Sequence, residues 1–223
     1  MCGRFAFYSP SEATAALFGV LQSPPVKARY NIAPTQLIAA IRKDEQEVPE
    51  LAMLRWGLVP FWAKDPAIGN RMINARAETV AEKPSFRNAY RKRRCLILAD
   101  GFYEWQKDAH GKTPYFISLQ DGEPFAFAGL WESWHNKDSD ESLQTVAVIT
   151  TAANEFMSTL HHRMPVVLRP EIAGRWLAGE GGILVEATEN APDFRAWPVD
   201  RKVNNARNES RDLIDATGEA VSA

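Results

Sequence analysis

Residues 95–130 read CLILADGFYEWQKDAHGKTPYFISLQDGEPFAFAGL, and this stretch decides the fold class of the 223-residue chain. It contains four β-type runs separated by short segments of turn residues: 95–99, 102–106, 115–119 and 124–130. Further β-type runs occur at 3–8, 37–41, 51–56 and 145–150. Strands and helices do not alternate regularly along the chain. The pattern therefore predicts one mainly β, α+β domain rather than a doubly wound parallel sheet.

Helices are expected around this β core. Ser9, Pro10 and Glu12 predict a helix start, with Ser9 as N-cap, Pro10 at the first helical position and Glu12 closing a capping box. Helical spacing also appears over three later segments, 84–94, 152–159 and 170–177. Residues 57–82 show little periodicity, and so long an irregular segment in a compact domain is often functional. The last dozen residues, from Asp212, are expected to fray.

The composition is that of a globular protein, with 45% hydrophobic and 24% charged residues, which excludes disordered, fibrous and coiled-coil chains. The net charge of −2 argues against a simple polycationic nucleic-acid binder. The charge is unevenly distributed, however. Residues 1–100 hold 15 Lys and Arg against 9 Asp and Glu, a net of +6, whereas residues 101–223 hold 11 against 19, a net of −8. The basic half predicts an anion-binding face.

The sequence also predicts a cellular compartment. No segment approaches the roughly 20 apolar residues of a membrane span, and the N-terminus lacks the apolar region of a secretory signal. Two cysteines, Cys2 and Cys95, are too few for a disulfide scaffold, and no Cys/His spacing indicates a metal site. We therefore expect a cytoplasmic protein without metal or cofactor. Cys95 lies in an apolar run and is expected to be a buried, inert thiol.

Cys2 is the most informative residue for chemistry. If Met1 is removed, Cys2 presents an α-amine and a thiol on neighbouring carbons. The pKa values of these two groups are about 8 and about 8.5. Such a 1,2-aminothiol condenses with an aldehyde to a Schiff base, and the thiol then closes a five-membered thiazolidine. Ring closure is intramolecular, with effective molarities that reach about 10⁵ M or more. The alternative is an incidental cysteine near a chain end.

Three polar residues are candidates for proton handling and positioning. Glu104 lies between aromatic residues and shares a strand face with Phe102, which favours burial and a raised carboxyl pKa over an outward, solvated position. His161 and His162 are adjacent, are expected to point in different directions, and offer one proton shuttle; the alternative is a helix-end histidine. Asn74 could orient a sugar hydroxyl, a carbonyl or a phosphate, or form a turn.

Basic residues suggest nucleic-acid contacts. Five of the eight residues in 87–94 are basic, and a helix would place Arg87, Arg91 and Arg94 on one face, which could equally be a solvated surface. Arginines in the first half are interleaved with aromatic residues, as in single-strand-binding grooves, although aromatics more often belong to a core. The aromatic residues concerned are Phe5, Tyr30, Trp56, Phe61 and Trp62.

Six ordered motifs together resemble one family. They are MCGRF at 1–5, YNIAP at 30–34, WGLVP at 56–60 with Trp62 after it, INARAET at 73–79, ADGFYEW at 99–105 and HHRMP at 161–165, followed by VNN at 203–205. Their order and content resemble the SRAP (SOS response-associated peptidase) family. The resemblance implies a single SRAP domain over 2–215, with an antiparallel, barrel-like β core and peripheral helices, and a frayed tail over 216–223.

The family resemblance also implies a function. SRAP proteins are sensors of abasic sites in single-stranded DNA and form a thiazolidine crosslink through the mature N-terminal cysteine. By resemblance the chain would be a monomer that associates with the nucleoid when bound to DNA, an autopeptidase that removes Met1, and an enzyme with abasic-site lyase activity.

Site roles are carried over by motif. Cys2 would be the nucleophile, Asn74 would position the sugar and the cysteine, Glu104 would handle protons, and His161 would act in acid–base steps and reversal. The expected DNA-binding residues are Arg4, Arg76, Trp62, Lys83 and Arg163. Two other readings of the chain stay open. One is a thiol hydrolase with Cys2 as nucleophile and His161 as base, and the other is a non-catalytic single-strand-binding module.

Overall fold

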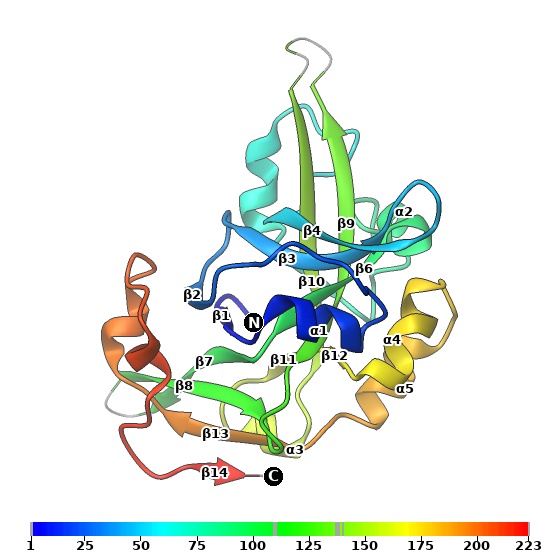
Figure 1. The fold of residues 1–223 in the computed structure, drawn as a ribbon. Coiled ribbons are helices and arrows are strands. Elements are labelled where there is room, and N and C mark those ends of the chain that lie inside the picture. Colours follow the sequence, from blue (N-terminus) through cyan, green and yellow to red (C-terminus); the bar gives the residue numbers. More distant parts are fainter. Residues whose placement is uncertain (1, 109–110, 137–138, 140, 223) are drawn as a thin grey trace.

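The computed structural model describes residues 2–108, 111–136, 139 and 141–222, and its centre is a closed barrel of five strands (Figure 1). Around the barrel the order is β10, β4, β3, β6 and β9, and the β9–β10 pairing closes it. The strands are β3 (Leu37–Lys43), β4 (Pro49–Trp56), β6 (Arg94–Ala99), β9 (Phe125–His135) and β10 (Ser142–Ala152). Only β4 and β10 pair in parallel within this ring. The predicted antiparallel, barrel-like core is confirmed.

The barrel strands are apolar on both faces because both faces are covered. In β6 the five residues from Cys95 to Ala99 are all buried, as are the first six of β9. On the outside of β6, the indole Nε1 of Trp176 donates to the carbonyl of Cys95 at 2.9 Å. Trp176 belongs to a peripheral helix, so side chains facing away from the barrel centre also belong to the core. Cys95 is buried, as expected.

A second sheet of six strands lies beside the barrel and positions the N-terminus (Figure 1). Its order is β14, β13, β8, β7, β1 and β2. The bounds are β1 (Phe5–Phe7), β2 (Arg29–Ile32), β7 (Gly101–Asp108), β8 (Gly111–Leu119), β13 (Phe194–Pro198) and β14 (Val221–Ser222). Strand β1 pairs antiparallel with β7, with Phe5 opposite Phe102. Phe5 also packs edge-on against Trp56 at 5.3 Å between ring centroids, which ties the start of the chain to the barrel.

Short elements surround the two sheets (Figure 1). The helices are α1 (Ser11–Leu17), η1 (Pro66–Arg71), α2 (Arg87–Lys92), α3 (Glu155–Ser158), α4 (Pro170–Leu177), α5 (Ile183–Glu189), η2 (Arg201–Asn204) and η3 (Arg211–Ile214). Three short strands, β5 (Asn74–Arg76), β11 (Arg163–Pro165) and β12 (Val167–Leu168), extend the barrel sheet. Among the described residues, no helix is long and apolar enough to cross a membrane.

Three local expectations differ from the structure. The N-cap of α1 is Pro10, because the Ser9 side chain binds the Asp100 carboxylate instead of the helix. The helix expected over 84–94 is confined to α2, because Arg94 begins strand β6, so Arg94 does not share a helix face with Arg87 and Arg91. The segment expected to fray from Asp212 contains η3 and β14, and β14 pairs with β13.

Gly101, the first residue of β7, lies where the packing leaves no room for a side chain. A Cβ at this position would lie 2.3 Å from Cζ of Phe116 and 2.7 Å from the carbonyl oxygen of Ile117. Gly101→Ala is therefore expected to lower the free energy of unfolding by about 1–3 kcal/mol in urea denaturation. Gly174→Ala is the matched control, because Gly174 lies within α4 with nothing within 4 Å of its added Cβ. It is expected to add up to about 1 kcal/mol of stability. Equal midpoints for the two variants would contradict this account.

Candidate reactive-cysteine site

Cys2 is buried, and a residue of the barrel sheet binds its backbone. The side-chain Nδ2 of Asn74 donates to the Cys2 carbonyl at 2.9 Å. Asn74 is the first residue of β5, which pairs in parallel with β10, so the barrel fixes its position. Its Oδ1 atom is also buried and has no hydrogen-bond partner among the described residues. This oxygen can accept a hydrogen bond from a group that enters beside Cys2.

Glu104 lies beside Cys2 because β1 and β7 are neighbours. The Phe5–Phe102 register places the residues before Phe5 alongside those after Phe102, and Tyr103 N–H donates to the Arg4 carbonyl at 2.9 Å. Burial raises the pKa of the Glu104 carboxyl group. Burial also raises the pKa of the Cys2 thiol, and the nearby negative charge of Glu104 raises it further. Glu104 is thus placed to hold a proton next to the thiol.

His161 and His162 lie in the turn between α3 and β11. Nδ1 of His161 lies 3.0 Å from the backbone nitrogen and 3.1 Å from the carbonyl oxygen of Arg163, so it can accept from the first or donate to the second. Burial lowers the pKa of His161, so the neutral ring is favoured. The expectation that the two histidines point in different directions is wrong, because the chain bends at His162 and the ring centroids lie 4.3 Å apart. Electrostatic attraction between His162 and Glu104 links this turn to the Cys2 site.

Arg163 is engaged within the protein. Its guanidinium contacts both carboxylate oxygens of Glu78, at 2.6 and 3.0 Å, and its Nη2 donates to the Thr150 carbonyl at 2.7 Å. This bidentate pair joins the segment after β5 to the start of β11. The arrangement orients the His161 turn relative to Asn74. Direct DNA binding by Arg163 stays a prediction.

Arg4 is half-buried and binds the C-terminal part of the chain. Its Nη1 donates to Oδ1 of Asn31 and to the carbonyl of Val203, both at 2.7 Å. The guanidinium also lies over the ring of Trp105, 5.8 Å from the centroid. Trp105 in turn donates from Nε1 to Oδ1 of Asn204 at 2.7 Å. Arg4 therefore connects the strand next to Cys2 with the η2 segment, and its phosphate contact stays a prediction.

Asn31 is a positioning residue that sequence reasoning did not single out. It is fully buried, and its Nδ2 donates to the carbonyls of Asn205 and Asn208 at 3.1 and 2.8 Å. Asn31 lies within the YNIAP motif, so the signal was present in the sequence. These two carbonyls lie more than 170 residues away, and no local pattern reveals the contacts with them.

The other expected DNA-binding residues are on the surface. Arg76, Lys83 and Trp62 are exposed, and Trp62 borders a shallow pocket of about 310 Å³. The proposed set of interleaved aromatics divides into three groups by exposure. Phe5 and Trp56 are core residues with no exposed surface, Tyr30 is half-buried, and only Phe61 and Trp62 are about half exposed. Of this set, only Phe61 and Trp62 are therefore exposed enough to stack on bases.

Comparison with known proteins identifies the family of the chain. A model of the family described as SOS response associated peptidase (SRAP) matches residues 1–206. Abasic site processing protein YoaM of Bacillus subtilis is 42% identical, over 97% of this chain and 98% of that protein. Abasic site processing protein YedK of Escherichia coli is 32% identical, over 96% and 99%. A crystal structure from Bacteroides thetaiotaomicron matches with a TM-score of 0.84 at 25% identity, over 97% of this chain and 100% of that one. The chain belongs to the SRAP family.

Proposed function

We propose that this protein processes abasic sites in single-stranded DNA by capturing the ring-opened sugar covalently through Cys2. One observation carries the proposal: the second residue of the chain is a buried cysteine, held at its carbonyl by Asn74 and placed beside Glu104. Relatives that align over nearly the whole chain are named abasic site processing proteins, which supports the same substrate. An abasic sugar presents an aldehyde, the group with which an aminothiol reacts.

The first step is removal of Met1, which lies outside the described residues. Hydrolysis of the Met1–Cys2 peptide bond, by the protein's own thiol or by an aminopeptidase, frees the α-amine of Cys2. The autopeptidase reaction would use Cys2 as the nucleophile. The raised pKa of the buried thiol means that it is protonated before a base acts on it. Glu104 is the nearby group suited to receive that proton.

Capture then proceeds in two bond-forming steps. The amine nitrogen attacks the C1′ aldehyde carbon, and loss of water gives a Schiff base, with Glu104 donating a proton to the departing oxygen. The thiol sulfur next bonds to the imine carbon and its proton passes to nitrogen, which closes the thiazolidine. Asn74 holds the cysteine backbone and, through Oδ1, a sugar hydroxyl. No redox partner is needed.

His161 serves the sugar side of the reaction. Its neutral ring can transfer protons at the sugar oxygen during capture, and in the reverse sequence when the crosslink opens. The same Schiff base supports abasic-site lyase chemistry when ring closure is slow: a base removes a C2′ proton and the 3′ phosphate leaves. Thiazolidine formation competes with that cleavage, so the crosslink shields the strand.

DNA contacts complete the proposal. Arg4 and Arg76 would hold phosphates beside the lesion, with Lys83 and Arg163 adding charge and Trp62 stacking on a base. Phosphate contacts carry no sequence information, so no base specificity is expected. We further propose that the protein acts as a monomer in the cytoplasm and joins the nucleoid through these contacts.

The test is direct. Purified protein lacking Met1, as checked by intact mass, is incubated with a single strand that contains one abasic site. A stable adduct of the mass of protein plus DNA minus one water is expected, and none with the same strand whose aldehyde has been reduced. Absence of an adduct would reject the proposal. Turnover of peptides by the same protein, without an adduct, would instead support the thiol hydrolase.

A further inference from the structure

The segment around α2 has a marked excess of positive charge. Residues 79–99 hold six cationic side chains and a single carboxylate, Glu82. Like charges repeated along a helix face oppose folding when no partner offsets them. The six cations fall into two groups that differ in what they contact.

Two of the six are engaged with other parts of the protein, one with strand β9 and one with α4 and the residues after it. Arg93 pairs with the buried carboxylate of Glu132 at 2.9 Å. Arg94 donates to the carbonyl of Glu180 at 2.7 Å, and its guanidinium lies 4.4 Å from the ring centroid of Trp176. These arginines fasten α2 and the start of β6 to their surroundings. Their charged groups therefore interact within the protein.

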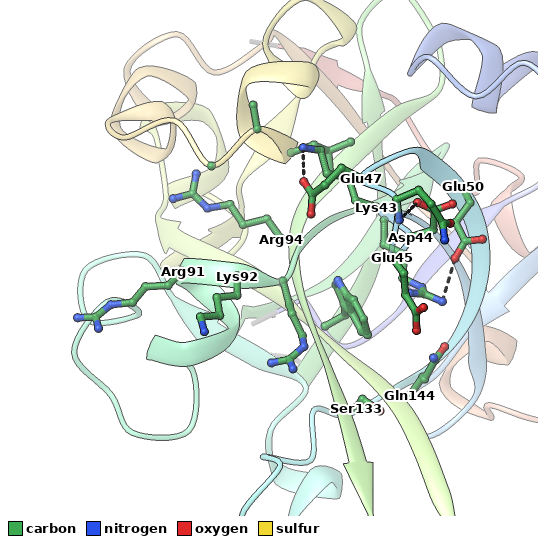
Figure 2. Close-up of a pocket in the computed structure, with 17 residues that line it drawn as sticks. Lys43, Asp44, Glu45, Glu47, Glu50, Arg91, Lys92, Arg94, Ser133 and Gln144 are labelled. Carbon is green, nitrogen blue, oxygen red and sulfur yellow. Dashed lines mark hydrogen bonds and ion pairs between the residues drawn. The ribbon is translucent and has the colours of Figure 1, made fainter.

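The other four face solvent. Lys83, Arg87, Arg91 and Lys92 are exposed, and within the part of the chain that the structure describes none of them forms an ion pair. Figure 2 shows Arg91 and Lys92 on the α2 side of a groove of about 850 Å³. We refer to Arg87, Arg91 and Lys92 as the α2 ridge.

A continuous series of turns connects the α2 ridge to the Cys2 site. The backbone N–H of Thr79 bonds to the carbonyl of Arg76, that of Lys83 to Thr79, and that of Arg87 to Lys83. Helix α2 then carries the chain to Arg91. Lys83, Arg87 and Arg91 thus recur at every fourth residue. Within α2, the four-residue spacing from Arg87 to Arg91 rises about 6 Å at about 1.5 Å per residue. That rise matches about two nucleotide steps of about 3.4 Å each.

Carboxylates on the opposite wall of the groove limit where DNA can bind. The β3–β4 hairpin presents Glu45, Glu47 and Glu50, of which Glu47 pairs with Lys43 and Glu50 with Arg42 (Figure 2). Carboxylates on this wall would repel a polyanion lying across the groove. A phosphate backbone is therefore directed along the outer side of α2 and not onto the hairpin.

We propose that the α2 ridge binds the phosphodiester backbone of the DNA that flanks the abasic site, continuing the path from Arg76 and Lys83. The inference rests on the proposed function for its ligand. It adds a contact on α2, an element that carries none of Cys2, Asn74 and Glu104.

The experiment measures non-covalent binding to intact DNA, so that it does not depend on the crosslink. Arg87→Gln/Arg91→Gln is compared with Lys27→Gln/Arg169→Gln, which also removes two exposed charges, but from outside α2. Each is titrated by fluorescence anisotropy at several salt concentrations, against a long single strand and a strand with a duplex flank. Crosslinking of a short abasic oligonucleotide is measured in parallel.

Loss of two phosphate contacts should reduce the salt slope on a single strand by about 1.4. Wild type would then lose about sevenfold more affinity than the ridge variant between 50 and 200 mM salt. A smaller salt slope of the ridge variant on one or both DNAs supports the proposal, provided that the control variant and the crosslinking of the short oligonucleotide are unchanged. The DNA on which the slope falls identifies the flank that the ridge binds. Wild-type slopes on both DNAs would overturn it. A wild-type protein that binds but forms no adduct would reject the proposed function alone.

Discussion

Cys2→Ala is expected to eliminate the stable protein–DNA adduct. The variant keeps an α-amine once Met1 is removed, so it can form the Schiff base, but it has no sulfur to close the ring. The Schiff base hydrolyses, and the adduct should appear on denaturing gels only when it is trapped by borohydride. Wild type should give the adduct without reductant. Without reductant the variant should therefore lose the whole adduct band, because ring closure is the step that makes the crosslink persistent.

Cys95→Ala is the matched control for Cys2→Ala. Both thiols are fully buried, and burial raises the pKa of both. Cys95 lies opposite Gly129 of strand β9, and the charge of Glu104, which raises the pKa of Cys2, is not among the causes of the pKa shift of Cys95. Cys95→Ala should therefore crosslink as wild type does. A borohydride-independent adduct with Cys2→Ala would show that another nucleophile captures the sugar.

Intact mass of the Cys2→Ala protein gives a second result from the same sample. If the thiol of Cys2 removes Met1, the variant should retain Met1 when it is produced with aminopeptidase inhibited, whereas wild type should lose it. Retention of Met1 by both proteins under this inhibition would assign the removal to the aminopeptidase, and loss from both would show that the Cys2 thiol is not needed.

The sequence was sufficient for the fold class but not for how the barrel closes. The apolar runs that became β3, β4, β6, β9 and β10 are visible because each fills a buried surface. Closure depends on β10 pairing with β9 on one side and, in parallel, with β4 on the other. The β9–β10 pairing is a hairpin of consecutive strands, but the β4–β10 pairing joins segments far apart in the sequence and leaves no local periodicity. The three-residue β5 is too short to show a pattern, although it carries Asn74.

The site shows a similar division. Cys2 and Glu104 could be selected because an aminothiol and a carboxylate between aromatics have distinctive chemistry. The contacts that position them could not, since Arg4 reaches Val203 and Arg163 reaches Glu78 across the fold. Composition also could not separate Phe5, a core residue, from the exposed Trp62. Exposure depends on which strands pair, and that is decided by the whole chain.

Glu104→Gln is expected to slow crosslinking by about 10²- to 10⁴-fold, the usual contribution of a positioned proton donor. Glutamine keeps the shape and the hydrogen-bonding capacity of the side chain but cannot transfer a proton. In wild type the rate should rise with pH as the α-amine loses its proton, then fall as pH passes the raised pKa of Glu104. The variant should lack the falling limb.

Stability should change with pH in a defined direction. Burial raises the folded-state pKa of Glu104, so the stability that its neutral form contributes is fully present below its unfolded pKa of about 4.3. That contribution is lost as pH rises through the folded value. Glu104→Gln should therefore gain stability relative to wild type between acidic and neutral pH, as measured by urea denaturation at each pH.

Glu132→Gln separates the chemical effect of Glu104 from the effect of burial. Glu132 is also a buried carboxylate whose pKa is raised by burial, but it pairs with Arg93 beside α2, away from Cys2. Its amide variant should alter stability and leave the crosslinking rate and pH profile unchanged. If Glu104→Gln crosslinked at the wild-type rate at every pH, Glu104 would be a structural carboxylate, and proton transfer would fall to the His161 turn.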